Sequence, residues 1–160
     1  MKKSLWIAVL VFAADRVTKY LALRLTAPVP LVPGLLQLRL ARNTGMAFSL
    51  FSGQPVLLGI LSLALLAAGI AVLTRYRLGP VSRTGAMLVL GGAAANIADR
   101  LLYGSVVDMI EITAFRFAVF NVADMAVTAG CVLLGISLIW IGKEWETRNG
   151  TDGTDRHADR

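Results

Sequence analysis

Two aspartates, Asp108 and Asp124, are the residues of this sequence best suited to acid–base chemistry. Asp108 lies in the apolar setting Val106-Val107-Asp108-Met109-Ile110, and Asp124 lies at the beginning of an apolar run. Both fall at the same predicted edge of the apolar segments. Two carboxylates that approach within a few Å of each other there would be partly desolvated and would repel one another, so they would share a proton near neutral pH.

Such a pair can hydrolyse a peptide bond without a metal or a cofactor. The ionised carboxylate takes a proton from water, the water attacks the scissile carbonyl, and the neutral acid protonates the developing oxyanion or the leaving amine. A helix that begins near Asp124 favours its anion, which predicts that Asp124 is the more easily ionised partner. Asn121 and Asp124 also fit a helix cap, and capping alone would explain both residues.

Other ionisable residues interrupt apolar segments, where an unpaired charge is costly. Asp15 and Lys19 are four residues apart, which predicts an ion pair on one helix face, directed either into a bundle or, as a snorkelling pair, toward an interface. Asn96, Asp99 and Arg100 likewise share a helix face, after a run of small residues. Because small residues allow close helix approach, this segment could also be a packing seam that ends in an interfacial ion pair.

The chain that carries these residues is too apolar for an ordinary soluble domain. Of its 160 residues, 56% are hydrophobic and 16% are charged, and the mean hydropathy is +0.68. The net charge of +6 comes from Lys and Arg residues scattered between apolar segments, which argues for membrane orientation and against nucleic-acid binding. A single cysteine, Cys131, excludes a disulfide framework and is expected to be buried, while a single histidine, His157, excludes an all-histidine metal site.

Four apolar segments are long enough to span a membrane, which requires about 20 residues. They are Ser4 to Leu23, Pro55 to Thr74, Thr84 to Tyr103, and Val122 to Ile141. The sequence therefore predicts an all-α membrane protein with four transmembrane helices, folded as one domain over residues 1–148. Residues 149–160 have no apolar anchors and predict a disordered polar tail.

The connecting segments predict the orientation and a small sheet. The start Met1-Lys2-Lys3 and the arginines between the second and third apolar segments share a side, which the positive-inside rule makes cytoplasmic, although three arginines of the opposite loop count against it. An even number of spans then places both termini in the cytoplasm. The alternation Leu36-Gln37-Leu38-Arg39-Leu40 predicts a strand, and hence a small extracytoplasmic β-sheet over the helix ends. Residues 104–121 are expected to form a short loop.

Five short motifs follow one another along the chain. They are Asp15-x-x-x-Lys19, Asn43-Thr44-Gly45-Met46-Ala47-Phe48-Ser49, the run from Gly91-Gly92 to Asn96-x-x-Asp99-Arg100, Val107-Asp108, and Phe120-Asn121-Val122-Ala123-Asp124. Together they resemble the motifs of the lipoprotein signal peptidase (signal peptidase II) family, in order and in rough spacing. The resemblance covers nearly the whole chain from Asp15 to the last apolar segment.

This resemblance implies a bacterial inner-membrane aspartic endopeptidase. It would remove the signal peptide from diacylglyceryl-modified prolipoproteins, cleaving just before the lipidated cysteine, at an active site near the extracytoplasmic face. Asp108 and Asp124 would be the catalytic aspartates. The residues expected to bind substrate or to support the site are Asp15, Lys19, Asn43, Gly45, Asn96, Asp99, Arg100, Asn121 and Ala123. The expected partners are the prolipoprotein and membrane lipid, with no metal, cofactor or nucleic acid, and the chain is expected to be a monomer.

Three other functions remain open. A proton-coupled transporter could relay charge through residues such as Asp15 and Asp99, although the acids cluster toward one predicted face. A non-enzymatic scaffold could pack through the Gly and Ala seams. A serine–lysine protease could bring Ser49 or Ser52 to Lys19 at the outer face.

Overall fold

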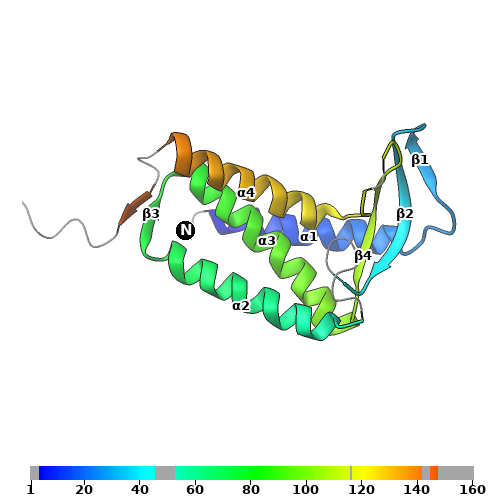
Figure 1. Ribbon diagram of the computed structural model, residues 1–160, viewed down its shortest axis with the longest axis horizontal. Helices are drawn as coiled ribbons and strands as arrows, with labels where there is room; N and C mark the ends of the chain where they lie inside the picture. The colour runs from blue at the N-terminus through cyan, green and yellow to red at the C-terminus, as the bar shows by residue number, and fades with distance from the viewer. Residues whose placement is uncertain (1–3, 46–52, 116, 142–144, 148–160) are drawn as a thin grey trace, which may run out of the picture.

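Four helices form an elongated bundle in the computed structural model, which describes residues 4–45, 53–115, 117–141 and 145–147 (Figure 1). The helices are α1 (Leu5–Ala22), α2 (Pro55–Leu73), α3 (Pro80–Tyr103) and α4 (Val122–Trp140). They coincide with the four apolar segments, so the four predicted helices are confirmed. The tail predicted to be disordered, 149–160, lies outside the described residues, as do Ser49 and Ser52.

Three of the helices in the described part of the chain, α2, α3 and α4, are long and apolar enough to cross a membrane. The first helix, α1, has 18 residues but carries Asp15, Arg16 and Lys19. Length and composition therefore identify three candidate spans, and the fourth predicted span depends on how the charges of α1 are neutralised.

An antiparallel sheet crosses one end of the bundle (Figure 1). It contains β1 (Val29–Val32), β2 (Leu36–Asn43) and β4 (Val106–Ile112), in the order β1-β2-β4. The predicted strand over Leu36 to Leu40 is confirmed as part of β2. We call this end of the molecule the sheet end, and both the last turn of α3 and the first turn of α4 lie beside it.

The prediction of a short loop over residues 104–121 is wrong, because β4 occupies its first half. Ala41 of β2 is paired with Asp108 of β4, and Ile110 forms a further bridge to Phe120, just before α4. The alternation of apolar and polar residues that marks an amphipathic strand is absent here, since the buried position at the centre of β4 holds an aspartate. As a result, Asp108 lies on a hydrogen-bonded strand rather than on a flexible connection.

A second, two-stranded sheet lies at the opposite end of the bundle and was not predicted. It pairs β3 (Tyr76–Leu78) with β5 (Trp145–Thr147). The ring of Trp145 packs edge-on against Tyr76 at a centroid distance of 5.6 Å, and its indole N–H donates to Ser137 at 3.0 Å. These contacts join the α2–α3 connection to the segment that follows α4.

Close packing of α3 against α4 depends on glycines, as small-residue runs predict. A Cβ on Gly130 would lie 2.6 Å from the carbonyl oxygen of Gly85, and one on Gly85 would lie 2.8 Å from that of Gly130. Nearer the sheet end, Gly92 faces the Ala123 backbone in the same way. By contrast, Cys131 is exposed on α4, so the expectation that it is buried is wrong.

Adding a methyl group at this seam should destabilise the fold. We expect Gly130→Ala to lower the free energy of unfolding by roughly 1–3 kcal/mol, because the helix backbones must separate. Gly135→Ala is the matched control on the same helix, since no atom of the described part of the chain lies within 4 Å of its added Cβ. Thermal unfolding in detergent measures both, and equal melting temperatures for the two variants would contradict the close-packed seam.

Candidate active site

Asp108 is held on β4 by two side-chain amides. The side-chain N–H of Asn121 donates to Oδ1 of Asp108 at 2.6 Å, and that of Asn43 donates to Oδ2 at 3.1 Å. Asn43 is the last residue of β2 and Asn121 precedes α4, so two different elements converge on this carboxylate. The residue is 2% exposed.

Asp124 lies in the first turn of α4 and takes part in a reciprocal cap. Its backbone N–H donates to the side-chain oxygen of Asn121 at 2.9 Å, and the backbone N–H of Asn121 donates to Oδ2 of Asp124 at 3.1 Å. The other carboxylate oxygen accepts from the side chain of Asn96 on α3 at 2.7 Å. The predicted cap is therefore present, but capping alone does not account for the contacts that Asn121 makes with Asp108.

Asn121 joins the two carboxylates into one site. It is fully buried, and its side-chain N–H group faces both Asp108 and the Asn96 oxygen, the latter at 3.2 Å. Burial, followed by the charge of Asp124, raises the pKa of Asp108 from 3.8 to about 6, while the hydrogen bonds from Asn43 and Asn121 act in the opposite direction. The arrangement brings together a protonatable acid and a second carboxylate, which is what shared-proton chemistry requires.

A cluster of four charges on α1 and α3 lies behind this pair. Lys19 contacts Asp15 at 2.8 Å and Asp99 at 2.7 Å, and Arg16 contacts both of these acids as well. Asp15, Lys19 and Asp99 are all buried. The predicted Asp15–Lys19 ion pair is thus confirmed and faces the bundle, which excludes the snorkelling alternative.

Asp99 finds its partners on α1 rather than beside it on α3. It pairs with Lys19 and Arg16, so the alternative of an interfacial ion pair with Arg100 is wrong. Arg16 was not predicted as a site residue. Its position next to Asp15 inside an apolar segment was the signal that could have identified it.

The remaining predicted residues complete a continuous network. The backbone N–H of Ala123 donates to Asp15 at 3.0 Å, and Arg100 donates to the Gly45 carbonyl at 3.2 Å. Gly45 in turn donates its N–H to the Asn43 side chain at 2.9 Å. Every residue that the sequence predicted to act in or support the site therefore belongs to one connected set of hydrogen bonds and ion pairs at the sheet end.

The carboxylates of this site are surrounded by hydrogen-bond donors. Among the described residues, no group of three or more His, Cys, Asp or Glu side chains is arranged to hold an ion. The carboxylate oxygens instead accept hydrogen bonds from amide and backbone donors, which suits proton transfer.

Comparison with known proteins identifies the family. Residues 7–140 match the family model described as signal peptidase (SPase) II. This chain belongs to the signal peptidase II family. The lipoprotein signal peptidase of Lactobacillus johnsonii is 36% identical over 146 residues, which cover 86% of this chain and 92% of that protein. That of Trichormus variabilis is 41% identical over 139 residues, covering 81% and 85% respectively.

A solved structure agrees with this assignment. A bacterial membrane enzyme determined by the in meso method at 2.3 Å resolution superposes with a TM-score of 0.80 and 26% identity, covering 100% of this chain and 96% of that chain. This signal peptidase II is therefore a peptidase, and its apolar helices make it a multi-pass membrane protein.

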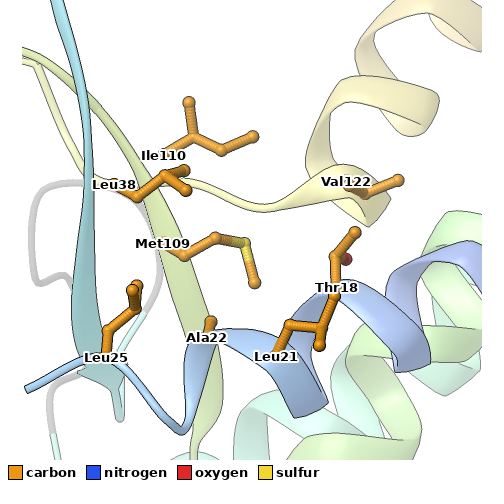
Figure 2. Close-up of a pocket in the computed structure, with 8 residues that line it drawn as sticks. All are labelled: Thr18, Leu21, Ala22, Leu25, Leu38, Met109, Ile110 and Val122. Atoms are coloured by element: carbon orange, nitrogen blue, oxygen red, sulfur yellow. The ribbon is translucent and has the colours of Figure 1, made fainter. Parts of the chain in front are cut away.

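An apolar pocket of about 210 Å³ lies beside the polar network of the peptidase (Figure 2). Several of its lining residues are sequence neighbours of site residues: Thr18 precedes Lys19, Met109 follows Asp108, and Val122 follows Asn121. The other lining residues are Leu21, Ala22, Leu25, Leu38 and Ile110. The same three backbone segments thus carry charged or amide side chains into the site and Thr18, Met109 and Val122 into the pocket.

The raised pKa of Asp108 predicts a specific pH dependence. Because the folded-state pKa lies above the ordinary 3.8, ionising Asp108 costs stability, which should fall as the pH rises from about 4 to 6. If Asp108 must be protonated for catalysis, kcat/KM should also fall as the pH rises through its pKa.

Removing the Asn43 side chain should move the falling limb of the kcat/KM profile to higher pH. Asn43→Ala deletes a donor that stabilises ionised Asp108, so we expect a shift of roughly one pH unit toward higher pH. Gln37→Ala is the control, since Gln37 lies on the same strand but donates to Glu111. A limb that moves to lower pH in Asn43→Ala would contradict the assignment of this limb to Asp108.

Proposed function

We propose that Asp108 and Asp124 are the catalytic aspartates with which this signal peptidase II removes the signal peptide from prolipoproteins. The substrate would be the diacylglyceryl-modified form, and cleavage would fall just before the lipidated cysteine. One observation carries the proposal: Asn121 binds both acids in a buried site, with its side-chain N–H on Asp108 and its backbone N–H on Asp124.

The two carboxylates have different surroundings and therefore suit different roles. Asp124 accepts from Asn96 and from a backbone N–H at a helix N-terminus, and both interactions favour its anion. The pKa of Asp108 is raised to about 6, which favours its neutral form. Asp124 would take a proton from the attacking water while Asp108 gives a proton to the carbonyl oxygen. Collapse of the tetrahedral intermediate then breaks the C–N bond, and the amine leaves with a proton from the dyad.

Two further groups of the site could bind the substrate backbone. Arg100 lies on α3 with one nitrogen on the Gly45 carbonyl, and its charge interacts with both Asp108 and Asp124. Its Nε is buried and has no hydrogen-bond partner among the residues that the structure describes. A peptide carbonyl in the site would satisfy that donor, since a buried N–H without a partner is costly.

We also propose that α1 crosses the membrane as a fourth span. Its three ionisable residues lie against α3, where two cations meet two acids, so the helix carries no uncompensated charge into the bundle. Four spans would place both termini on the same side, which the positive-inside rule makes the cytoplasmic side of the bacterial inner membrane. The active site at the sheet end would then lie near the extracytoplasmic face.

The other expectations from the sequence stand as part of this proposal. Residues 1–148 would form a single peptidase domain. The enzyme would act as a monomer on prolipoprotein within membrane lipid, without a metal, a cofactor or nucleic acid. Against the transporter alternative, Asp99 is held between Lys19 and Arg16, in an ion-pair cluster beside the dyad.

Conservative replacement of either acid should abolish cleavage. We expect Asp108→Asn and Asp124→Asn each to lower kcat at least about 100-fold, because neither amide can transfer the required proton. The assay is a gel-shift cleavage of diacylglyceryl-modified prolipoprotein in detergent, with chelator present.

Glu111→Gln provides the matched control for this assay. Glu111 lies on the same strand as Asp108, but it pairs with Arg39, 2.7 Å away, outside the site network. This variant should cleave at the native rate. Near-native cleavage by Asp108→Asn or Asp124→Asn would show that the dyad assignment is wrong, whereas loss of activity in all three variants would indicate a general defect.

Thiol labelling tests the proposed orientation. In a Cys131→Ser background, Pro33→Cys places a thiol beside the β1–β2 turn, and Arg75→Cys places one at the opposite end of the bundle, both at exposed positions. A membrane-impermeant reagent should label the first in intact spheroplasts and the second only after permeabilisation. The reverse labelling pattern would show that the protein has the opposite orientation in the membrane.

A further inference from the structure

Lys19 has no donor to spare. Its ammonium group carries three N–H bonds and cannot accept a hydrogen bond. It contacts Asp15 at 2.8 Å, Asp99 at 2.7 Å and the side-chain oxygen of Asn96 at 2.9 Å. The residue is only 3% exposed, so these protein partners take the place of water.

These contacts dictate which way the Asn96 amide points. Its oxygen accepts from Lys19 and from the side chain of Asn121, so its NH₂ group is left facing Asp124. A flipped amide would set two N–H bonds against the ammonium of Lys19 and would turn an oxygen toward the carboxylate. Protonation of Asp124 would relieve only the second of these two conflicts, so the flipped orientation is unfavourable.

The orientation of the second amide has a different origin. The oxygen of Asn121 accepts from the backbone N–H of Asp124, which fixes its NH₂ group on Asp108. The helix cap therefore determines the donor to Asp108 and supplies one donor to Asp124, the backbone N–H of Asn121. The second donor to Asp124 is the side chain of Asn96, and its orientation depends on the shorter contact to Lys19 at 2.9 Å together with the contact to Asn121 at 3.2 Å.

We propose that Lys19 is a positioning residue for the peptidase reaction, which orients the Asn96 amide so that its N–H group holds Asp124 in the ionised form that activates water. This inference rests on the proposed function of the dyad. It assigns Lys19 a role in the chemical step that is distinct from neutralising charge, since Arg16 contacts the same two acids but makes no hydrogen bond to Asn96.

The charges around the dyad allow this role to be separated from charge balance. Asp15 and Asp99 carry two negative charges, and Arg16 and Lys19 carry two positive ones. Lys19→Met/Asp99→Asn and Arg16→Met/Asp99→Asn both leave one acid with one cation. Only the second variant keeps the ammonium beside Asn96, so their difference reports what Lys19 does and Arg16 does not.

Cleavage of diacylglyceryl-modified prolipoprotein by both double variants tests the proposal. We expect kcat of Lys19→Met/Asp99→Asn to be at least tenfold below that of Arg16→Met/Asp99→Asn, with a similar KM and melting temperature.

The pH profile provides a second readout. Asp108 is faced by Asp124 from α4, by Lys19 from α1 and by Arg100 from α3. Because the charge of Lys19 lowers the pKa of Asp108, the basic limb of the lysine variant should lie at higher pH. Equal kcat values and superimposable pH profiles would overturn the proposal.

If Lys19→Met/Asp99→Asn does not fold, a second variant tests the proposal. Asn96→Asp keeps an acceptor for Lys19 but, when ionised, presents no N–H to Asp124. It should lower kcat at least tenfold at pH 8, with partial recovery at lower pH as the new carboxyl is protonated. Native kcat at pH 8 would overturn the proposal.

The dyad variants separate this inference from the proposed function. If Asp108→Asn or Asp124→Asn still cleaves, the function assigned to the dyad fails. If both are inactive while the two double variants are alike, only the role of Lys19 fails.

Discussion

A buried charge in an apolar bundle must be neutralised inside the bundle, and the Lys19 ammonium is where this molecule meets that requirement. Lys19 joins Asp15 of its own helix to Asp99 of α3 and also reaches Asn96. Leaving any of these groups unpaired would cost several kcal/mol, so α1 and α3 have one favourable relative position. The other residues of the site connect to this contact through hydrogen bonds.

Close helix approach is the second condition for the site. The side chain of Asn96 reaches Asp124 at 2.7 Å because Gly92, one turn earlier on α3, lets the backbone of α4 come near. Ala123 is fully buried at the same level, and its N–H reaches back to Asp15. Small residues and polar residues therefore act together: the former set the distance between helices, and the latter use it.

The sheet, and not the helix bundle, carries one of the two acids of the site. Asp108 is carried on β4, whose pairing with β2 holds it beside the start of α4. Burial and, after it, repulsion from Asp124 both oppose ionisation of Asp108, and its raised pKa expresses that cost. A strand held on one side by a ladder and on the other by the Phe120 bridge can tolerate this cost better than a loop, because its backbone hydrogen bonds resist displacement.

Much of this protein was determined by local sequence alone. Four apolar runs predicted four helices, the Asp15–Lys19 spacing predicted an ion pair, and the Asn121–Asp124 spacing predicted a cap, because each depends only on helical geometry. Tertiary structure decided what local patterns cannot contain. The strand β4 forms through pairing with β2, which is distant in the sequence: Asn43 and Asp108, which are in contact, are 65 residues apart. The aspartate at a buried position of β4 interrupts the alternation of apolar and polar residues that would identify a strand. Likewise, Asp99 pairs with Lys19 and Arg16 rather than with its neighbour Arg100, because α1 packs against that face of α3. Which cation reaches a buried acid is therefore decided by the packing of the bundle.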